Sequence, residues 1–138
     1  MQSLQSGSIL IDNADGEMKP DLSEQTYEWH FLTRYPPSYL NNPRLIEMFR
    51  QWVKVTADAE ADFEMKLRRT AMSAIKVDDP KLIRQSLQCL AHVGSLDDLS
   101  ELAVLEGHAD PFVRRDVNTC IFEIRHRSGQ AGPPKRLE

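Results

Sequence analysis

Apolar residues recur at helical spacing in two stretches of the second half of the chain. The later stretch, 110–127, carries them at intervals of i, i+4, i+7, i+8 and i+11, and they are Val113, Val117, Cys120, Ile121 and Ile124. The earlier stretch, 79–93, repeats this spacing with Ser86 in the place that corresponds to Val117. Because these intervals put side chains on one stripe of an α-helix, each stretch is predicted to be a helix that buries one face.

Both predicted helices begin with the same dipeptide. Asp79-Pro80 and Asp110-Pro111 lie 31 residues apart, and at this offset Arg84 corresponds to Arg115. Aspartate is a favoured N-cap because its side chain accepts hydrogen bonds from otherwise unpaired backbone N–H groups, and proline is tolerated at the first helical position. The sequence therefore predicts where both helices start.

Another predicted helix precedes each of these two. Residues 96–106 follow Ser95, a capping residue, and are closed by Gly107. Residues 57–76 place acids early and bases late, which suits the helix dipole, and they predict one long helix. A fainter copy of the Asp-Pro helix starts at Asn42-Pro43. The chain is thus predicted to repeat a hairpin of two helices.

The repeated Asp-Pro turns, followed by Leu82-Ile83-Arg84 and Val113-Arg114-Arg115 and then by Cys-Leu and Cys-Ile pairs, resemble HEAT repeats of the short, phycocyanobilin lyase-like type. The resemblance covers 42–127 and implies an all-α fold, a short right-handed α-solenoid of about two and a half hairpins. In this family the second helix of each hairpin usually lines the concave side. The resemblance therefore implies six candidate contacts for a partner, which are Arg84, Gln85, Gln88, Arg115, Asn118 and Thr119.

The last predicted helix differs from the inner one outside the common stripe. Ile83 and Leu87 give the inner helix a second apolar flank, where the last helix carries Arg114 and Asn118. A terminal repeat needs such a polar outer face, so the repeats are expected to finish near Arg127. The predicted organisation is a flexible acidic arm over 1–20, one helical domain over 21–127 with repeats from 42, and a disordered tail over 128–138.

Five of the chain's aromatic residues cluster ahead of the first repeat, and they are Tyr27, Trp29, Phe31, Tyr35 and Tyr39. They fall in a predicted cap segment, 21–41, in which a capped start favours a helix towards Arg34 while the aromatic alternation favours a strand. The cluster can serve as a clasp over the exposed edge of the first hairpin. It can also bind a partner, for which Trp29 and Tyr35 are the candidates.

Charge and composition narrow the class of function. The chain has 41% hydrophobic and 28% charged residues, as globular domains do, and a net charge of −4, which disfavours a broad nucleic-acid binder. Acids outnumber bases in 1–33, and bases outnumber acids in 110–138. Solvated helix faces explain this distribution, and the alternatives are an acidic partner or head-to-tail self-association. With two cysteines and no signal or membrane-spanning pattern, we expect a soluble cytoplasmic protein.

The titratable residues do not form a recognisable catalytic or metal-binding pattern. Cys89 and Cys120 fall on the predicted buried stripes and are expected to be core residues. The four histidines, His30, His92, His108 and His126, lack metal-ligand spacing and are expected at the surface or at hinges. Arg84 and Arg115 can alternatively pair with the aspartate of a neighbouring turn. No cofactor, metal or catalytic residue is predicted.

The leading hypothesis is a non-catalytic protein–protein interaction module, a scaffold or adaptor for another bacterial protein. A homodimer of this chain, which would extend its small groove, is an additional expectation. Two alternatives come from the resemblance. One is a HEAT-like nucleic-acid enzyme of the alkylpurine DNA glycosylase type, which uses more repeats and a basic groove. The other is a bilin lyase-like protein. Nucleic acid is the less favoured partner because the chain is short and acidic, and no membrane partner is expected.

Overall fold

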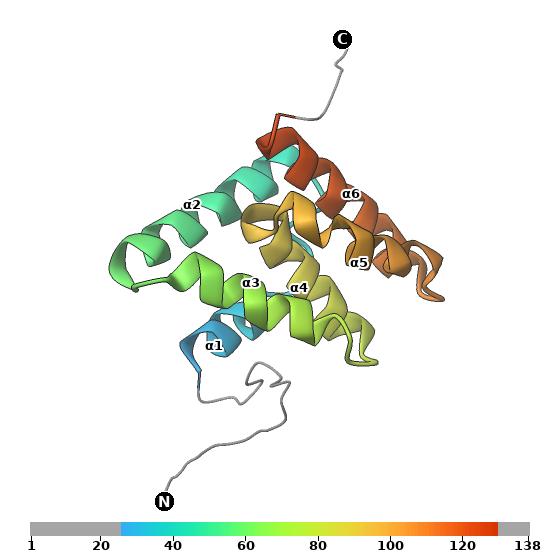
Figure 1. The fold of residues 1–138 in the computed structure, drawn as a ribbon, viewed down its shortest axis with the longest axis horizontal. Coiled ribbons are helices and arrows are strands. Elements are labelled where there is room, and N and C mark those ends of the chain that lie inside the picture. The colour runs from blue at the N-terminus through green and yellow to red at the C-terminus, as the bar shows by residue number, and fades with distance from the viewer. Residues whose placement is uncertain (1–25, 130–138) are drawn as a thin grey trace, which may run out of the picture.

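A computed structural model describes residues 26–129, and its regular structure in this range is entirely helical (Figure 1). The helices are α1 (Tyr27–Arg34), α2 (Pro43–Ala59), α3 (Phe63–Ala74), α4 (Pro80–Val93), α5 (Leu99–Ala103) and α6 (Pro111–Arg127), with 3-10 turns η1 (Leu96–Asp98) and η2 (Val104–Gly107) on either side of α5. The all-α prediction is confirmed for these residues. The predicted acidic arm and most of the predicted tail lie outside them.

The helix starts follow from the predicted capping residues. Asp79 and Asp110 each accept two hydrogen bonds from backbone N–H groups of the following turn, and Asn42 accepts one. Each cap is followed by a proline at the first helical position. The alternating aromatics near the start of the described chain do not form a strand, because Thr26 caps α1 by accepting a hydrogen bond from the backbone N–H of Trp29.

Helix α4 lies at the centre of the core. It packs most extensively against α6 and next against α3, and it also contacts α1. Its buried residues run almost without interruption from Leu82 to His92. Ile83 and Leu87 are buried, whereas Arg114 and Asn118 on α6 are exposed, so the predicted difference between the inner and the last helix is confirmed.

Two predicted helices are wrong in extent. The long helix expected over 57–76 is interrupted at residues 60–62, where Asp62 adopts a left-handed conformation with φ of 59°. The local sequence does not predict this turn, because it contains no glycine or proline. The helix expected over 96–106 is divided into η1, α5 and η2, although the Ser95–Asp98 capping box that should begin it is present.

The end of α4 and the end of α6 are joined closely. Gly94 ends α4 at a place where an added Cβ would lie 2.8 Å from the Ile124 side chain and 2.7 Å from the Leu90 carbonyl oxygen. Arg127 donates hydrogen bonds to the carbonyl oxygens of Ala91, at 3.2 Å, and Gly94, at 2.8 Å. These bonds satisfy carbonyl groups that the end of a helix leaves unpaired.

Candidate interaction surface

The end of α1 and most of the connection from α1 to α2 lie across α4, and we call this stretch, residues 33–41, the covering segment. It is held mainly by two glutamines of α4. Gln85 donates from Nε2 to the carbonyl oxygens of Thr33, at 3.2 Å, and Tyr35, at 2.8 Å. Gln88 accepts from the backbone N–H of Tyr39 at 2.7 Å. The glutamines are 5% and 1% exposed, so these amides are part of the interior.

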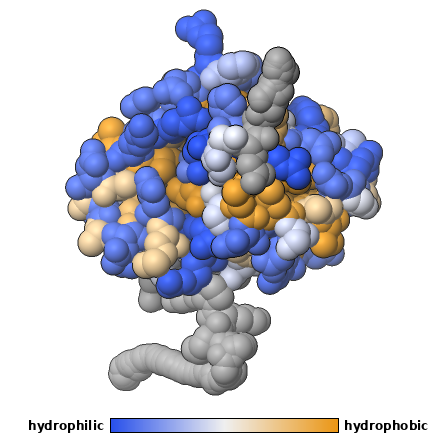
Figure 2. All heavy atoms as spheres, turned by 45° about the horizontal axis from the view of Figure 1, so that its top comes forward, coloured by the Kyte–Doolittle hydropathy of each residue, from blue (hydrophilic) through white to orange (hydrophobic). Residues whose placement is uncertain are grey.

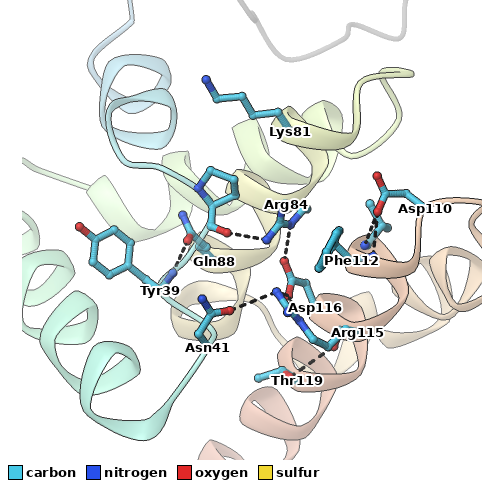
Figure 3. Close-up of polar contacts among 12 residues, drawn as sticks. Tyr39, Asn41, Lys81, Arg84, Gln88, Asp110, Phe112, Arg115, Asp116 and Thr119 are labelled. Carbon is cyan, nitrogen blue, oxygen red and sulfur yellow. Dashed lines mark hydrogen bonds and ion pairs between the residues drawn. The ribbon is translucent and has the colours of Figure 1, made fainter.

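Arg84 connects the covering segment to α6. Its Nη2 donates to the carbonyl oxygen of Pro37 at 2.7 Å, and its Nε donates to Asp116 at 2.8 Å (Figure 3). Arg115 binds the other carboxylate oxygen of Asp116 through two nitrogens, each at 3.0 Å, and reaches Asn41 at 3.1 Å. The Asp116 side chain is only 2% exposed, and two guanidinium groups compensate its buried charge.

This arrangement corrects the alternative expectation for the two arginines. Arg84 and Arg115 do not pair with Asp79 and Asp110, which cap their own helices. Both arginines converge instead on Asp116, a residue that the sequence analysis did not single out. Its position corresponds to that of Gln85 at the repeat offset of 31, so a carboxylate there is a departure from the inner helix that could have been noticed.

Phe112 lies beside the two arginines at the surface. Its ring is 5.1 Å from the Cζ atom of Arg84 and 5.2 Å from that of Arg115, within the range of cation–π contacts, and the residue is 52% exposed. Phe122, two to three turns further along α6, is 56% exposed and stacks on His126. The spacing i, i+3, i+7 and i+10 places four residues along one side of α6, which we call the α6 stripe: Phe112, Arg115, Thr119 and Phe122.

The six contacts implied by the repeat resemblance therefore fall into two groups. Gln85 and Gln88 are buried beneath the covering segment, and Arg84 is largely enclosed between that segment and α6. Arg115 and Asn118 are exposed, and Thr119 is half-buried with its hydroxyl donating to the carbonyl oxygen of Arg115. Only the second group faces solvent in the described structure. Whether either group binds a partner stays a prediction.

The aromatic residues ahead of α2 pack on one another and on aromatic residues of α2. Tyr35 stacks on Trp52 of α2 with ring centroids 4.9 Å apart, and Tyr39 stacks on Phe49 at 5.6 Å. Trp29 is half-buried against the same core. This packing is what a clasp requires, and it leaves Trp29 and Tyr35 only partly accessible to a partner.

His92 is buried, which corrects the expectation that all four histidines lie at the surface or at hinges. It is 8% exposed, it packs against the ring of Phe49, and neither ring nitrogen has a hydrogen-bond partner within the described protein. Burial is the main cause that lowers the pKa of His92 to about 3, and the nearby Arg50 and Arg127 guanidinium groups contribute to this shift against a smaller opposing effect of Glu47. The imidazole is therefore neutral at physiological pH.

The two cysteines occupy the core positions predicted for them. Cys89 and Cys120 are fully buried free thiols. Burial raises the pKa of both thiols well above the usual range, so neither supplies a reactive thiolate at neutral pH.

A surface depression lies between α3 and the segment that includes α5. Its floor holds a bidentate ion pair in which Arg68 donates to both oxygens of Asp98 at 2.7 Å. Burial alone would raise the pKa of Asp98, but the hydrogen bonds from Arg68 and from the Ser95 backbone outweigh it and lower the pKa. The pair ties α3 to the capping box of η1, so its evident role is to join neighbouring helices.

Within residues 26–129 no group of three or more His, Cys, Asp or Glu side chains is arranged to hold a metal ion, and no helix is long and apolar enough to cross a membrane. Apolar side chains on the face shown in Figure 2 form separate groups among hydrophilic ones.

Searches with protein-family models, among curated proteins and among solved structures find no match to this chain, so the function is argued from the fold and the site alone.

Proposed function

We propose that this protein is a non-catalytic interaction module, a scaffold or adaptor that binds another protein through the α6 stripe and the adjoining edge of α4. In this proposal α3 with α4 and α5 with α6 are two HEAT-like hairpins, α2 is a partial third, and together they form a short right-handed α-solenoid. The observation that carries the proposal is the way α4 and α6 already bind a polypeptide, the covering segment.

The covering segment is recognised largely through its backbone. Three carbonyl groups and one N–H group of residues 33–41 bond side chains of α4, and proline contributes only an acceptor because it has no N–H. Such contacts do not depend on the side chains of the bound segment. A surface built from Arg and Gln side chains on adjacent helices therefore has the chemistry to bind the backbone groups of a polypeptide, here the end of α1 and the turns that follow it.

The α6 stripe offers the composition that protein interfaces favour. Exposed phenylalanines and an arginine supply apolar area and directional hydrogen bonds, and aromatic and arginine side chains contribute much of the binding energy in interfaces. Arg84 contacts the ring of Phe112 and Asp116 binds Arg115, so the Phe112 and Arg115 side chains lose less freedom on binding.

The charge distribution favours protein over nucleic acid as the partner. Arg84 and Arg115 are the bases that a groove between α4 and α6 would present to phosphate, but both pair with Asp116, which cancels one of their two charges. Phosphate binding depends on uncompensated Lys and Arg charges. The glycosylase-like alternative is therefore the weaker proposal, and no contact in the described residues favours a bilin lyase.

The test is co-purification from the cells that produce the protein, with two variants that each replace two exposed apolar residues by serine. Phe112→Ser with Phe122→Ser removes the apolar part of the stripe, and Val104→Ser with Val77→Ser removes exposed apolar side chains elsewhere. We expect the wild type and the second variant to retain the same partner, and the stripe variant to bind it at least about thirty-fold more weakly. Equal retention by both variants would contradict the proposal.

A further inference from the structure

The connection between α2 and α3 is the least expected feature of the fold. It consists of residues 60–62, and Asp62 has a φ of 59° although it is not glycine. This conformation is unfavourable for a residue with a Cβ atom, and only short polar residues adopt it readily. Asp62 stands at the N-cap of α3, yet its side chain makes no capping hydrogen bond there, so the turn gains no compensation from it.

The sequence around this turn favours a continuous helix. From Thr56 to Arg69 it contains no glycine or proline, and alanine, glutamate, leucine, lysine and arginine dominate it. These residues have high helix propensity, which is why one long helix is predicted across the turn. Local sequence and observed structure thus conflict at three residues, a conflict that the packing of the arm on the rest of the chain must overcome.

The parts of the chain on either side of the turn are joined by contacts that do not require them to belong to one molecule. We define the arm as residues 26–59 and the body as residues 63–129. The arm is held by the α4 hydrogen bonds to the covering segment, by aromatic contacts of Phe63 with α1, and by an ion pair of Arg50 with Glu123 at 3.3 Å. Figure 1 shows α2 and α3 diverging from the turn.

We propose that a second copy of this chain is a partner of the arm, through exchange of arms between two molecules. In the exchanged dimer, residues 60–62 become helical and join α2 to α3, which carries each arm away from its own body and onto the body of the other copy. The contacts named above between arm and body are kept, now between two molecules, and the unfavourable turn is lost in both chains. Exchange of identical elements at a short hinge under strain is a low-cost route to dimers.

Exposed apolar residues of α2, the helix that ends at the turn, support a second copy as the partner. Met48 is 39% exposed, Val55 is 67% exposed, and Ala59 is also exposed. Their spacings of seven and four residues place them on one stripe of α2 that runs to the turn. Two such helices would meet there in the dimer, where this stripe gains an apolar partner that it lacks in the single chain.

The hinge is tested by two substitutions at one position, with mass measured by light scattering after equilibration at high protein concentration. Asp62→Gly suits the left-handed turn and disfavours a helix interior, whereas Asp62→Ala does the reverse. Counting both hinges, we expect the dimer dissociation constant of the glycine variant to exceed that of the alanine variant by about a thousand-fold. A wild type and an alanine variant that stay monomeric at millimolar concentration would overturn the proposal.

Exchange is distinguished from simple side-by-side association by reversing the charges of the Arg50–Glu123 pair in separate chains. Arg50→Glu and Glu123→Arg each place like charges within one chain, but in an exchanged mixed dimer both arms meet a body of opposite charge. When the two variants are mixed and equilibrated at high protein concentration, most dimers should contain one chain of each variant. A statistical mixture, or no mixed dimer, would overturn arm exchange. The proposed binding of another protein by the α6 stripe does not depend on this result, because that stripe lies on the body.

Discussion

Neutral His92 predicts a specific loss of stability in mild acid. The folded protein encloses the imidazole among Phe49, Arg50 and Arg127, so protonation must occur mainly in the unfolded chain. Stability is therefore fully present above the unfolded pKa of 6.5 and falls as the pH decreases towards the folded pKa of about 3. The loss attributable to this residue is about 2 kcal/mol at pH 5 and grows to about 4 kcal/mol near pH 3.

The assay is urea unfolding followed by circular dichroism, at pH 7.5 and pH 5, for the wild type and His92→Leu. Most carboxylates remain ionised across this interval, so they contribute little to the difference. Leucine has a similar volume and does not titrate, and no hydrogen bond of the histidine is lost because its ring nitrogens have none within the described protein. We expect the wild type to lose about 2 kcal/mol more than the variant between these pH values.

Equal pH dependence in the two proteins would refute this reasoning. So would a folded-state titration of His92 near pH 6.5 by nuclear magnetic resonance, because it would show that the imidazole is not desolvated. Glu47, which lies near the ring on α2, favours protonation, but its effect is smaller than those of burial and of the two arginines. Arg50→Gln should accordingly raise the folded pKa of His92.

Three further substitutions test the packing of α4 and α6 by the same unfolding assay. Leu90→Ala should cost about 2–5 kcal/mol because the side chain is fully buried, and a loss under about half a kcal/mol would contradict its place in the core. Gly94→Ala should cost about 1–3 kcal/mol, since the new methyl group meets Ile124, and an unchanged stability would show that the helix ends can separate freely. Asp116→Asn should cost about 2–4 kcal/mol by leaving two arginines without their carboxylate, whereas a neutral result would mean that water replaces it.

The starts and the buried faces of α2, α4 and α6 could be predicted because local chemistry determines them. An Asp-Pro or Asn-Pro cap acts within one turn, and apolar spacing identifies the buried face whatever it packs against. The break at residues 60–62 could not be predicted in this way. It depends on packing of the arm against α3 and α4, and the residues of the turn themselves favour a helix.

The sequence predicted the helices that carry the candidate contact residues, but it did not predict which of these residues are exposed. Repeat spacing identified α4 and α6 as the helices that carry Arg84, Gln85, Gln88 and Arg115, and the structure brings these side chains together. The sequence could not show that the chain's own residues 33–41 cover two of them. That contact spans about fifty positions along the chain, and no local pattern encodes which distant backbone groups a glutamine will bond.

His92 shows a related limit. It sits in α4 four residues after Gln88, on a flank that the repeat pattern does not mark as apolar, so a surface position was the natural expectation. Its burial follows from α2, whose Phe49 packs on the ring. A helix that is covered on several sides buries more residue types than its strongest apolar stripe suggests.

Site-specific photo-cross-linking tests the proposed binding surface most directly. A benzophenone analogue of phenylalanine is placed at Phe122, on the α6 stripe, or at Val104, which is 77% exposed outside it, and the protein is irradiated in its native cells. We expect a single dominant cross-linked protein from position 122, the same one that co-purifies with the wild type, and little from position 104. Equal cross-linking at the two positions, or none at position 122 while a partner still co-purifies, would contradict binding through the α6 stripe.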